Sequence, residues 1–340
     1  MQTRSLILLA SATVVLAALA VVVLASGDRG VSRAAPGERA FPALAAKLGD
    51  VASVTVSHDN KTMTLIRYGD SWLVADKGNY PANAAKISQT VRAMADLTLL
   101  EQKTQKPDLY PRLEVDEPGN GKSALVAVKD KSGGDLAAAI VGKRRYDRLG
   151  PGNDGVYLRK PGEVQTWLAR GTLDPSGDTA SWLDRRIIDI SEKKIAKVAL
   201  TQADGSKLVI SRSAPDASFS VEDAPADAKF KSESTTSGPA GALETLDLDD
   251  VKPAGELPVP DKDVVTASFA MFGGLTVDVR LTERDKSNWI AISATGSGSA
   301  EAEAKKIDDK VAHWTYAIPA NKANLLKTKL ADLIEPAKGS

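Results

Sequence analysis

Short stretches that alternate between apolar and polar residues, joined by tight turns, occur twice in this chain in the same order. Each copy has three such stretches, with Asp-Asn or Asp-Gly at the first turn and an aromatic residue at the start of the third. Alternation with a period of two predicts β-strands, and turns of this type predict antiparallel hairpins. The copies cover residues 51–56, 63–66 and 72–74, and residues 195–200, 208–210 and 219–221. A weaker third copy covers residues 264–272, 275–281 and 289–292.

Helices are predicted between these meanders. Pro81-Ala-Asn83 precedes apolar residues at helical spacing, with Asn83 as the N-cap, and Pro319-Ala-Asn321 precedes a similar stripe. Each stripe is wide enough to cover one face of a sheet. Strands are also predicted at residues 125–128, 136–141 and 156–158, followed by a short helix at 163–169. We therefore expect an α+β fold in which antiparallel meanders and helices form two or three related units.

An uncharged apolar run lies near the N-terminus. From Leu6 to Ala25 only Ser11 and Thr13 interrupt a series of aliphatic and alanine residues. As a helix, this run covers about 30 Å, the thickness of a bilayer's hydrocarbon core. It is longer than the apolar region of a typical cleaved signal peptide, so we expect one transmembrane helix with the following domain in the periplasm. A cleaved signal peptide and a buried core helix are the alternatives.

The remaining chain is long enough for two domains. We expect an anchor over residues 1–26, a flexible tether over 27–40, a first α+β unit with an inserted meander over 41–190, and a second α+β region over 191–340. Within that region, residues 214–262 are rich in Pro, Asp, Ser and Ala and weakly patterned, which predicts an extended or mobile stretch.

The composition excludes several functions. The chain has 44 basic and 44 acidic residues, which argues against nucleic-acid binding, and it has no cysteine for disulfides, thiolate metal sites or thiol catalysis. Its two histidines, His58 and His313, are too few for a multi-histidine metal centre. A Ser-His-Asp hydrolase would need one of them as base, and no Gly-x-Ser-x-Gly motif accompanies them. We therefore expect no catalytic residues, cofactor or metal.

Three further motifs favour ordinary structural roles. Residues 119–123, Gly-Asn-Gly-Lys-Ser, resemble the end of a phosphate-binding loop, but a strand follows where that loop needs a helix, so a hairpin turn is favoured. Asp247, Asp249 and Asp250 lack the distal ligands of a calcium loop, and a solvated face is favoured. The densest basic cluster is a weak candidate for binding anionic headgroups or an acidic partner. It comprises Lys143, Arg144, Arg145 and Arg148.

The order of several segments resembles the uncharacterised domain-of-unknown-function family 4340. The segments are 41–44, 51–56, 72–74, 110–118, 140–142, 156–158, 182–185 and 313–319. The family usually has Tyr-Gly-Leu in the fourth segment, where this chain has Tyr110-Pro111-Arg112-Leu113. The resemblance implies a single-pass exported protein encoded beside a gliding-motility-type ABC transporter, and it supplies no catalytic residues. We expect a periplasmic binding or accessory protein associated with the permease subunits. An envelope hydrolase and a structural envelope spacer are the alternatives.

Overall fold

A computed structural model describes residues 35–119, 122–146, 154–175, 178–226 and 228–335 of the chain. The residues divide into two compact units at Asp184 and Arg185. The predicted membrane span over 6–25 lies outside the described residues. Within them, no helix combines the length and the apolar character needed to cross a bilayer.

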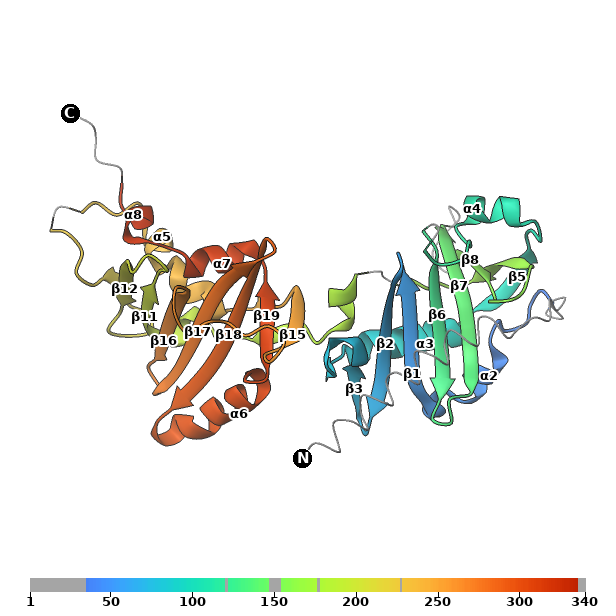
Figure 1. Cartoon of the computed structure of the whole chain (residues 1–340), viewed down its shortest axis with the longest axis horizontal. Helices are drawn as coiled ribbons and strands as arrows, with labels where there is room; N and C mark the ends of the chain where they lie inside the picture. Colours follow the sequence, from blue (N-terminus) through green and yellow to red (C-terminus); the bar gives the residue numbers. More distant parts are fainter. Residues whose placement is uncertain (1–34, 120–121, 147–153, 176–177, 227, 336–340) are drawn as a thin grey trace. The chain divides into compact units, whose positions relative to one another are not determined.

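The described residues of the first unit form a nine-stranded antiparallel sheet with short helices (Figure 1). Its strand order is β4-β3-β2-β1-β6-β7-β8-β9-β5. The strands are β1 Val51–His58, β2 Lys61–Tyr68, β3 Ser71–Val74, β4 Tyr80–Pro81, β5 Thr98–Gln102, β6 Ala124–Asp130, β7 Asp135–Arg145, β8 Gly155–Arg159 and β9 Thr166–Arg170. The helices are α2 Pro42–Ala46, α3 Ala84–Asp96 and α4 Tyr110–Leu113, with 3-10 turns η1 Leu48–Asp50, η2 Ala75–Lys77, η3 Pro107–Leu109 and η4 Thr179–Trp182.

Helix α3 crosses one face of this sheet (Figure 1). It begins where the sequence predicts, because the Asn83 side chain accepts a hydrogen bond from the Lys86 amide at 3.1 Å. Ile87 and Met94 are fully buried, and Val91 is nearly so. The apolar stripe of α3 thus covers the core of the first unit.

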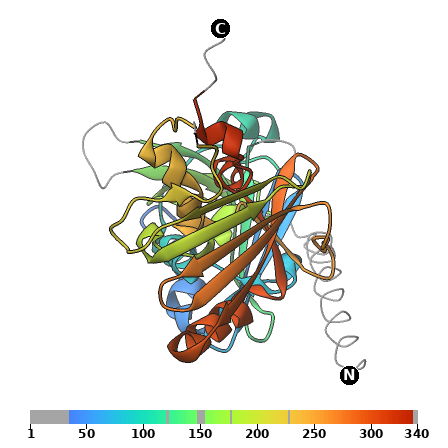
Figure 2. The same cartoon turned by 90° about the vertical axis from the view of Figure 1, so that its left-hand side faces the viewer.

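The second unit contains an eight-stranded antiparallel sheet in the order β13-β12-β11-β16-β17-β18-β19-β15, counted over its described residues. The strands are β11 Ile195–Thr201, β12 Lys207–Ser211, β13 Ser220–Val221, β15 Asp250–Pro253, β16 Val265–Met271, β17 Leu275–Arg284, β18 Ser287–Gly296 and β19 Trp314–Ile318, and β10 Arg186–Ile188 pairs with β14 Leu246–Asp247. The helices are α5 Glu233–Ser237, α6 Glu301–Val311, α7 Ala320–Leu326 and α8 Leu330–Leu333, with 3-10 turns η5 Glu192–Lys194, η6 Gly238–Leu243 and η7 Gly298–Ala300. Figure 2 looks onto this unit, with α6 at one end of the long strands.

The two strand orders correspond position by position. Strands β11, β12 and β13 take the places of β1, β2 and β3, and β16 to β19 take those of β6 to β9. Even the irregularity agrees, since the register shifts between Val51 and Ser53 in β1 and between Ile195 and Lys197 in β11. The predicted antiparallel sheets with helices are confirmed. The weaker third copy is the second half of the second sheet, because β16, β17 and β18 continue from β11.

Several sequence-based expectations differ from the structure. Residues 166–170 form strand β9 where a helix is expected, because this strand pairs with β8 on one side and β5 on the other. Residues 37–40, expected in the tether, instead lie along β5: Ala40 is buried, and its amide donates to the Leu97 carbonyl at 2.8 Å. The stretch 214–262, expected to be extended, carries α5, η6, β14 and β15.

Candidate binding site

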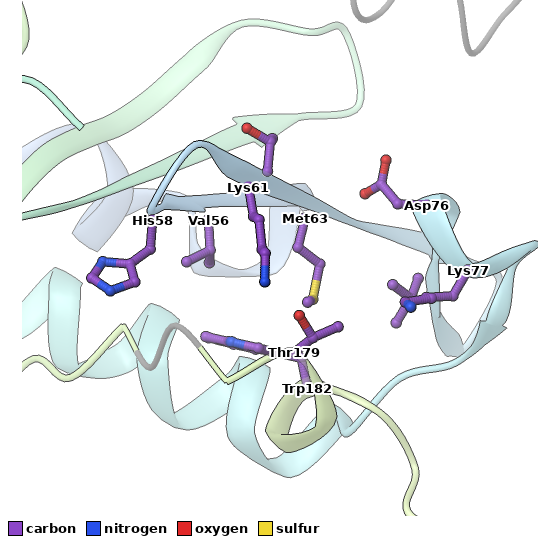
Figure 3. Close-up of a pocket in the computed structure, with 10 residues that line it drawn as sticks. Val56, His58, Lys61, Met63, Asp76, Lys77, Thr179 and Trp182 are labelled. Carbon is purple, nitrogen blue, oxygen red and sulfur yellow. The ribbon is translucent and has the colours of Figure 1, made fainter. Parts of the chain in front are cut away.

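A pocket of about 210 Å³ lies in the first unit between the β1–β2 hairpin and η4 (Figure 3). Its floor is apolar: Val56, Met63 and Val74 come from three neighbouring strands, and Trp182 comes from η4. All four side chains are at least nine-tenths buried. The pocket is therefore a concave site at the edge of the hydrophobic core and not a shallow depression among polar side chains.

The β1–β2 hairpin aims these side chains because strand positions alternate between the two faces. Val56 pairs with Met63, and His58 pairs with Lys61, so all four face the same side. The connecting residues Asp59 and Asn60 have φ values of 49° and 59°, as a two-residue hairpin turn of type I′ requires. Figure 3 shows Lys61 and Met63 extending from β2 toward Thr179 and Trp182.

The rim of the pocket carries two lysines and one carboxylate. His58 lies at one end of the pocket and Lys77 at the other (Figure 3). The Asp76 carboxylate turns away from the pocket and accepts a hydrogen bond from the Thr64 amide. Lys61 makes no ion pair with any described residue, so its ammonium group is available at the mouth of the pocket.

Both ring nitrogens of His58 have partners. Nδ1 lies 3.1 Å from the Ser123 carbonyl oxygen, and Nε2 lies 3.3 Å from the Asp59 carboxylate. The buried Ser123 hydroxyl has no hydrogen-bond partner among the described residues, and His58 contacts the carbonyl of this serine rather than its hydroxyl. A catalytic triad needs the histidine between a serine hydroxyl and a carboxylate. His58 does not have that arrangement.

The far wall of the pocket is braced by α3. The Lys86 ammonium lies 4.4 Å from the centre of the Trp182 ring and donates a hydrogen bond to the Ser181 hydroxyl. Burial lowers the pKa of Lys86, against the opposing effects of the Asp174 and Asp178 carboxylates. These contacts hold the indole in place and give the pocket a fixed wall.

The pocket is too small to enclose most small-molecule ligands, whose sites usually measure about 300–1,000 Å³. Its volume suits one apolar side chain. Pockets that accept a single anchoring side chain are typical of protein–protein interfaces. The arrangement can therefore bind an apolar residue with an acidic neighbour, the neighbour facing Lys61.

The corresponding place in the second unit is covered by the chain itself. The pair Val54–Leu65 in β1–β2 is equivalent to the pair Val198–Ile210 in β11–β12. Gln202, four residues after Val198, is therefore the counterpart of His58, four residues after Val54. The Gln202 amide donates to the Leu326 and Thr328 carbonyl oxygens, at 3.2 and 3.1 Å. The C-terminal end of α7 thus closes the second unit where the first unit has an open pocket.

Residues 72–263, more than half of the chain, match the family described as Domain of unknown function (DUF4340). The chain belongs to the DUF4340 family. No curated protein and no solved structure matches it.

Two of the segments that carry the family resemblance, 110–118 and 140–142, meet in the first unit. Tyr110 of α4, Ile140 of β7 and Val115 form a buried cluster. Arg159 lies below this cluster, where its guanidinium donates to the Val115 and Glu163 carbonyl oxygens and to the Glu117 carboxylate. These family segments therefore pack against one another and stabilise one end of the sheet.

The basic cluster predicted from the sequence lies at the exposed end of β7. Arg144 Nη1 is 3.9 Å from an Asp174 carboxylate oxygen, and Lys143 Nζ is 5.8 Å from the centre of the Tyr157 ring. Arg145 pairs through its backbone with Gly155, and Arg148 lies outside the described residues. The structure does not bring Lys143, Arg144 or Arg145 to the pocket, and the binding role of the cluster stays a prediction.

Two residues of the acidic triplet form ion pairs, and the third accepts a hydrogen bond from the backbone. Asp247 accepts a hydrogen bond from Arg186 Nε at 2.6 Å, and an Asp249 oxygen lies 3.7 Å from Arg185 Nη2. The Asp250 carboxylate accepts from the Val251 amide at 2.8 Å. Across the described ranges, no group of three metal-ligating side chains comes together.

The other two motifs are separate from the pocket floor. His313 is exposed at the start of β19, in the second unit. Of the loop over residues 119–123, Asn120 and Gly121 lie outside the described residues, and β6 begins directly afterwards at Ala124. Strand β6 stands where a phosphate-binding loop requires a helix.

Sequence reasoning missed the pocket because its two walls are far apart in the chain. Met63 and Trp182 are separated by more than a hundred residues, and no local pattern places η4 against the β1–β2 hairpin. The available signal was the alternation of Val56, His58, Lys61 and Met63, which put two polar groups beside two apolar ones on a single sheet face.

Proposed function

We propose that this chain is an exported binding protein, anchored in the cytoplasmic membrane by residues 6–25, that serves as an accessory subunit of an ABC transporter of the gliding-motility type. The pocket beneath the β1–β2 hairpin is its contact site for a permease subunit. The chain supplies binding rather than a reaction.

The observation that carries this proposal is the contrast between the two units. At one position the second unit closes its core with the end of α7, whereas the first unit leaves a pocket over Val56, Met63 and Trp182. Filling such a pocket with a partner's side chain removes apolar surface from water, which stabilises a complex by about 25 cal/mol per Å² before the costs of association. An open pocket with a fixed wall therefore supports a binding role.

The apolar run near the N-terminus supports the membrane anchor. Its 20 uncharged residues match the length of a bilayer-spanning helix. An anchored domain stays close to membrane-embedded partners, which raises its effective concentration toward them. Membership of the DUF4340 family, with the gene neighbourhood that the resemblance implies, supports a transporter as the partner.

Two measurements test the membrane anchor. The full-length protein should stay in the membrane pellet after alkaline carbonate washing, and an alkaline phosphatase fused to its C-terminus should be active. Release of the full-length product, or an inactive fusion, would contradict the anchor.

Purification from gently solubilised membranes tests the partner. We expect an ABC permease subunit to copurify with the wild-type protein and with Lys131→Glu, a charge reversal at the exposed β6–β7 turn. Lys61→Glu should reduce this recovery, because it reverses the charge at the mouth of the pocket. Equal recovery with both variants would contradict the pocket as the contact site.

A further inference from the structure

Each unit carries a groove, larger than the pocket described above, at the same place in its sheet. In the first unit a groove of about 660 Å³ runs along α3 between η1 and the β2–β3 hairpin, and in the second a groove of about 570 Å³ lies between η5, α5 and the β12–β13 connection. Residues Leu48 and Gly49 of the first groove correspond to Glu192 and Lys193 of the second, since Val51 and Ile195 begin equivalent strands.

Both grooves contain an arginine beside an aromatic ring. Arg67 of β2 pairs with Trp72 of β3. They follow the buried pair Leu65–Val74, since Arg67 is two residues after Leu65 and Trp72 is two residues before Val74. In the second unit, Arg212 stands two residues after Ile210, and Phe219 stands two residues before Val221, the partner of Ile210. The register thus makes Arg67 and Trp72 the counterparts of Arg212 and Phe219.

The second unit uses its arginine for structure. Arg212 Nε donates to the Ile195 carbonyl oxygen at 2.9 Å, a further nitrogen donates to the Glu192 carbonyl, and the guanidinium lies 4.4 Å from the centre of the Phe219 ring. Carboxylates outnumber the other cation of the lining, Lys193: they are Glu192, Asp216, Glu233 and Glu244. This groove does not favour an anion.

The first unit leaves its arginine exposed to the groove. Among the residues that the structure describes, Arg67 makes one weak hydrogen bond, from Nε to the Gly69 carbonyl oxygen at 3.3 Å, so most of its five donors have no partner there. Arg92 of α3 lines the same groove and makes no ion pair with any described residue. Two carboxylates, Asp70 and Asp96, also line this groove. Asp96 forms an ion pair with Arg39 at 3.4 Å, so Asp70 is the carboxylate left to offset the positive charges of Arg67 and Arg92.

We propose that the groove along α3 in the first unit binds a small organic anion, a carboxylate or phosphate on an apolar body. Arg67 and Arg92 bind the anionic group, because guanidinium groups match the geometry of carboxylates and phosphates. Leu48, which is 41% exposed, and the half-buried Trp72 contact the apolar body. The groove's volume lies in the range of small-molecule sites. This site is separate from the pocket beneath the β1–β2 hairpin, and it does not depend on the proposed transporter contact.

Calorimetric titration of the full chain in phosphatidylcholine nanodiscs, with empty discs as reference, tests this proposal. Hexyl phosphate and hexanoate are the probes, and hexanamide is the neutral comparison. We expect saturable binding of both anions, with hexanamide at least about tenfold weaker. Arg67→Gln and Arg92→Gln should each weaken binding by roughly tenfold or more, the usual effect of losing a hydrogen bond to a charged group.

Controls tie the binding to this groove. Arg112→Gln, an exposed arginine of α4 outside the groove, should leave the affinity unchanged. We also expect the anionic probes to change the tryptophan fluorescence of the wild type, and Trp72→Phe should remove that change. Binding of hexanamide as tight as that of the anions, unchanged affinity in Arg67→Gln and Arg92→Gln, or no saturable heat would overturn the proposal.

A second set of discs identifies the source of the anion. If phosphatidylglycerol in the disc competes with hexyl phosphate, the site takes a lipid headgroup. If it does not compete, the site takes a soluble anion. The groove is an anion site in either case.

Discussion

The guanidinium carbon of Arg159 lies 4.7 Å from the centre of the Tyr110 ring, and both side chains are more than nine-tenths buried. The Tyr110 hydroxyl donates to the Val164 carbonyl oxygen at 2.7 Å, while Arg159 reaches Val115 and Glu117. This stacked pair joins strand β8 to the segment that follows α4. This arrangement explains why a charged residue is tolerated in the interior: each of the three guanidinium nitrogens donates a hydrogen bond, and the flat face of the group is covered by a ring.

Arg159→Met should destabilise the protein by about 3 kcal/mol, because it removes a buried cation and leaves three acceptors without their donor. Urea unfolding measures the change. Arg112→Met, on the exposed side of α4, is the matched control and should change stability by less than about 0.5 kcal/mol. Equal effects of the two substitutions would refute the structural role of Arg159.

Gly142→Ala should also destabilise the first unit. A Cβ at this position would overlap the Leu113 carbonyl oxygen and lie 2.8 Å from that of Glu114, so α4 or β7 would have to move. We expect a loss of more than about 2 kcal/mol in urea unfolding. Gly49→Ala is the control, because an added Cβ there meets no atom of the described residues within 4 Å. A neutral Gly142→Ala would show that α4 does not pack against β7 in this way.

The two Pro-Ala-Asn sequences should respond differently to loss of the asparagine. Asn83→Ala removes the N-cap of α3 and should cost about 1 kcal/mol. Asn321→Ala should be nearly neutral, because α7 begins at Ala320 after Pro319 and Asn321 is exposed inside the helix. Thermal unfolding of both variants measures the difference. A larger loss for Asn321→Ala would contradict the helix starts described above.

The Asp204–Lys329 ion pair should make part of the stability sensitive to acid. A hydrogen bond from Lys329 at 2.6 Å, together with Ser206, holds the pKa of Asp204 well below its ordinary value of 3.8. Because the folded carboxyl binds its proton less tightly than the unfolded one, this stabilisation is complete above pH 3.8 and is lost as the pH falls below it.

The urea midpoint of Asp204→Asn should therefore lie below that of the wild type at pH 7 and approach it at pH 3. Asp285→Asn is the control, at a turn residue of the β17–β18 hairpin with positive φ and no ion pair to any described residue. A wild-type advantage over Asp204→Asn that stays constant between pH 7 and pH 3 would contradict the ion pair.

Local patterns predicted most of the sheet, and long-range pairing determined the rest. Asp59 and Asn60 form the turn of their hairpin with two positive φ angles. Aspartate and asparagine favour such turns, so the sequence alone indicates this hairpin. Trp167 lies in a strand rather than a helix, because β9 pairs on one side with β5, whose residues come more than sixty positions earlier in the chain. For the same reason the third meander could not be assigned to the second sheet, since β11 and β16 are joined through residues 202–264.

The candidate site was less predictable than the fold. The basic cluster around Arg144 is dense in sequence but lies at an exposed strand end. The pocket depends on Trp182, which stacks beneath Lys86, and the groove depends on Arg67 and Arg92, which lie on different elements. Both sites are formed by contacts between different elements. The spacing of residues along the chain predicts only which side chains share a face of one helix or strand.

Photo-crosslinking in living cells tests the central claim most directly. A photoreactive amino acid at position 61 would lie at the mouth of the pocket, and one at position 68, where Tyr68 is 76% exposed, would lie at the opposite end of β2. We predict that illumination links position 61, and not position 68, to a permease subunit of an ABC transporter. Absence of that adduct at position 61, or equal adducts at both positions, would contradict a transporter contact through this pocket.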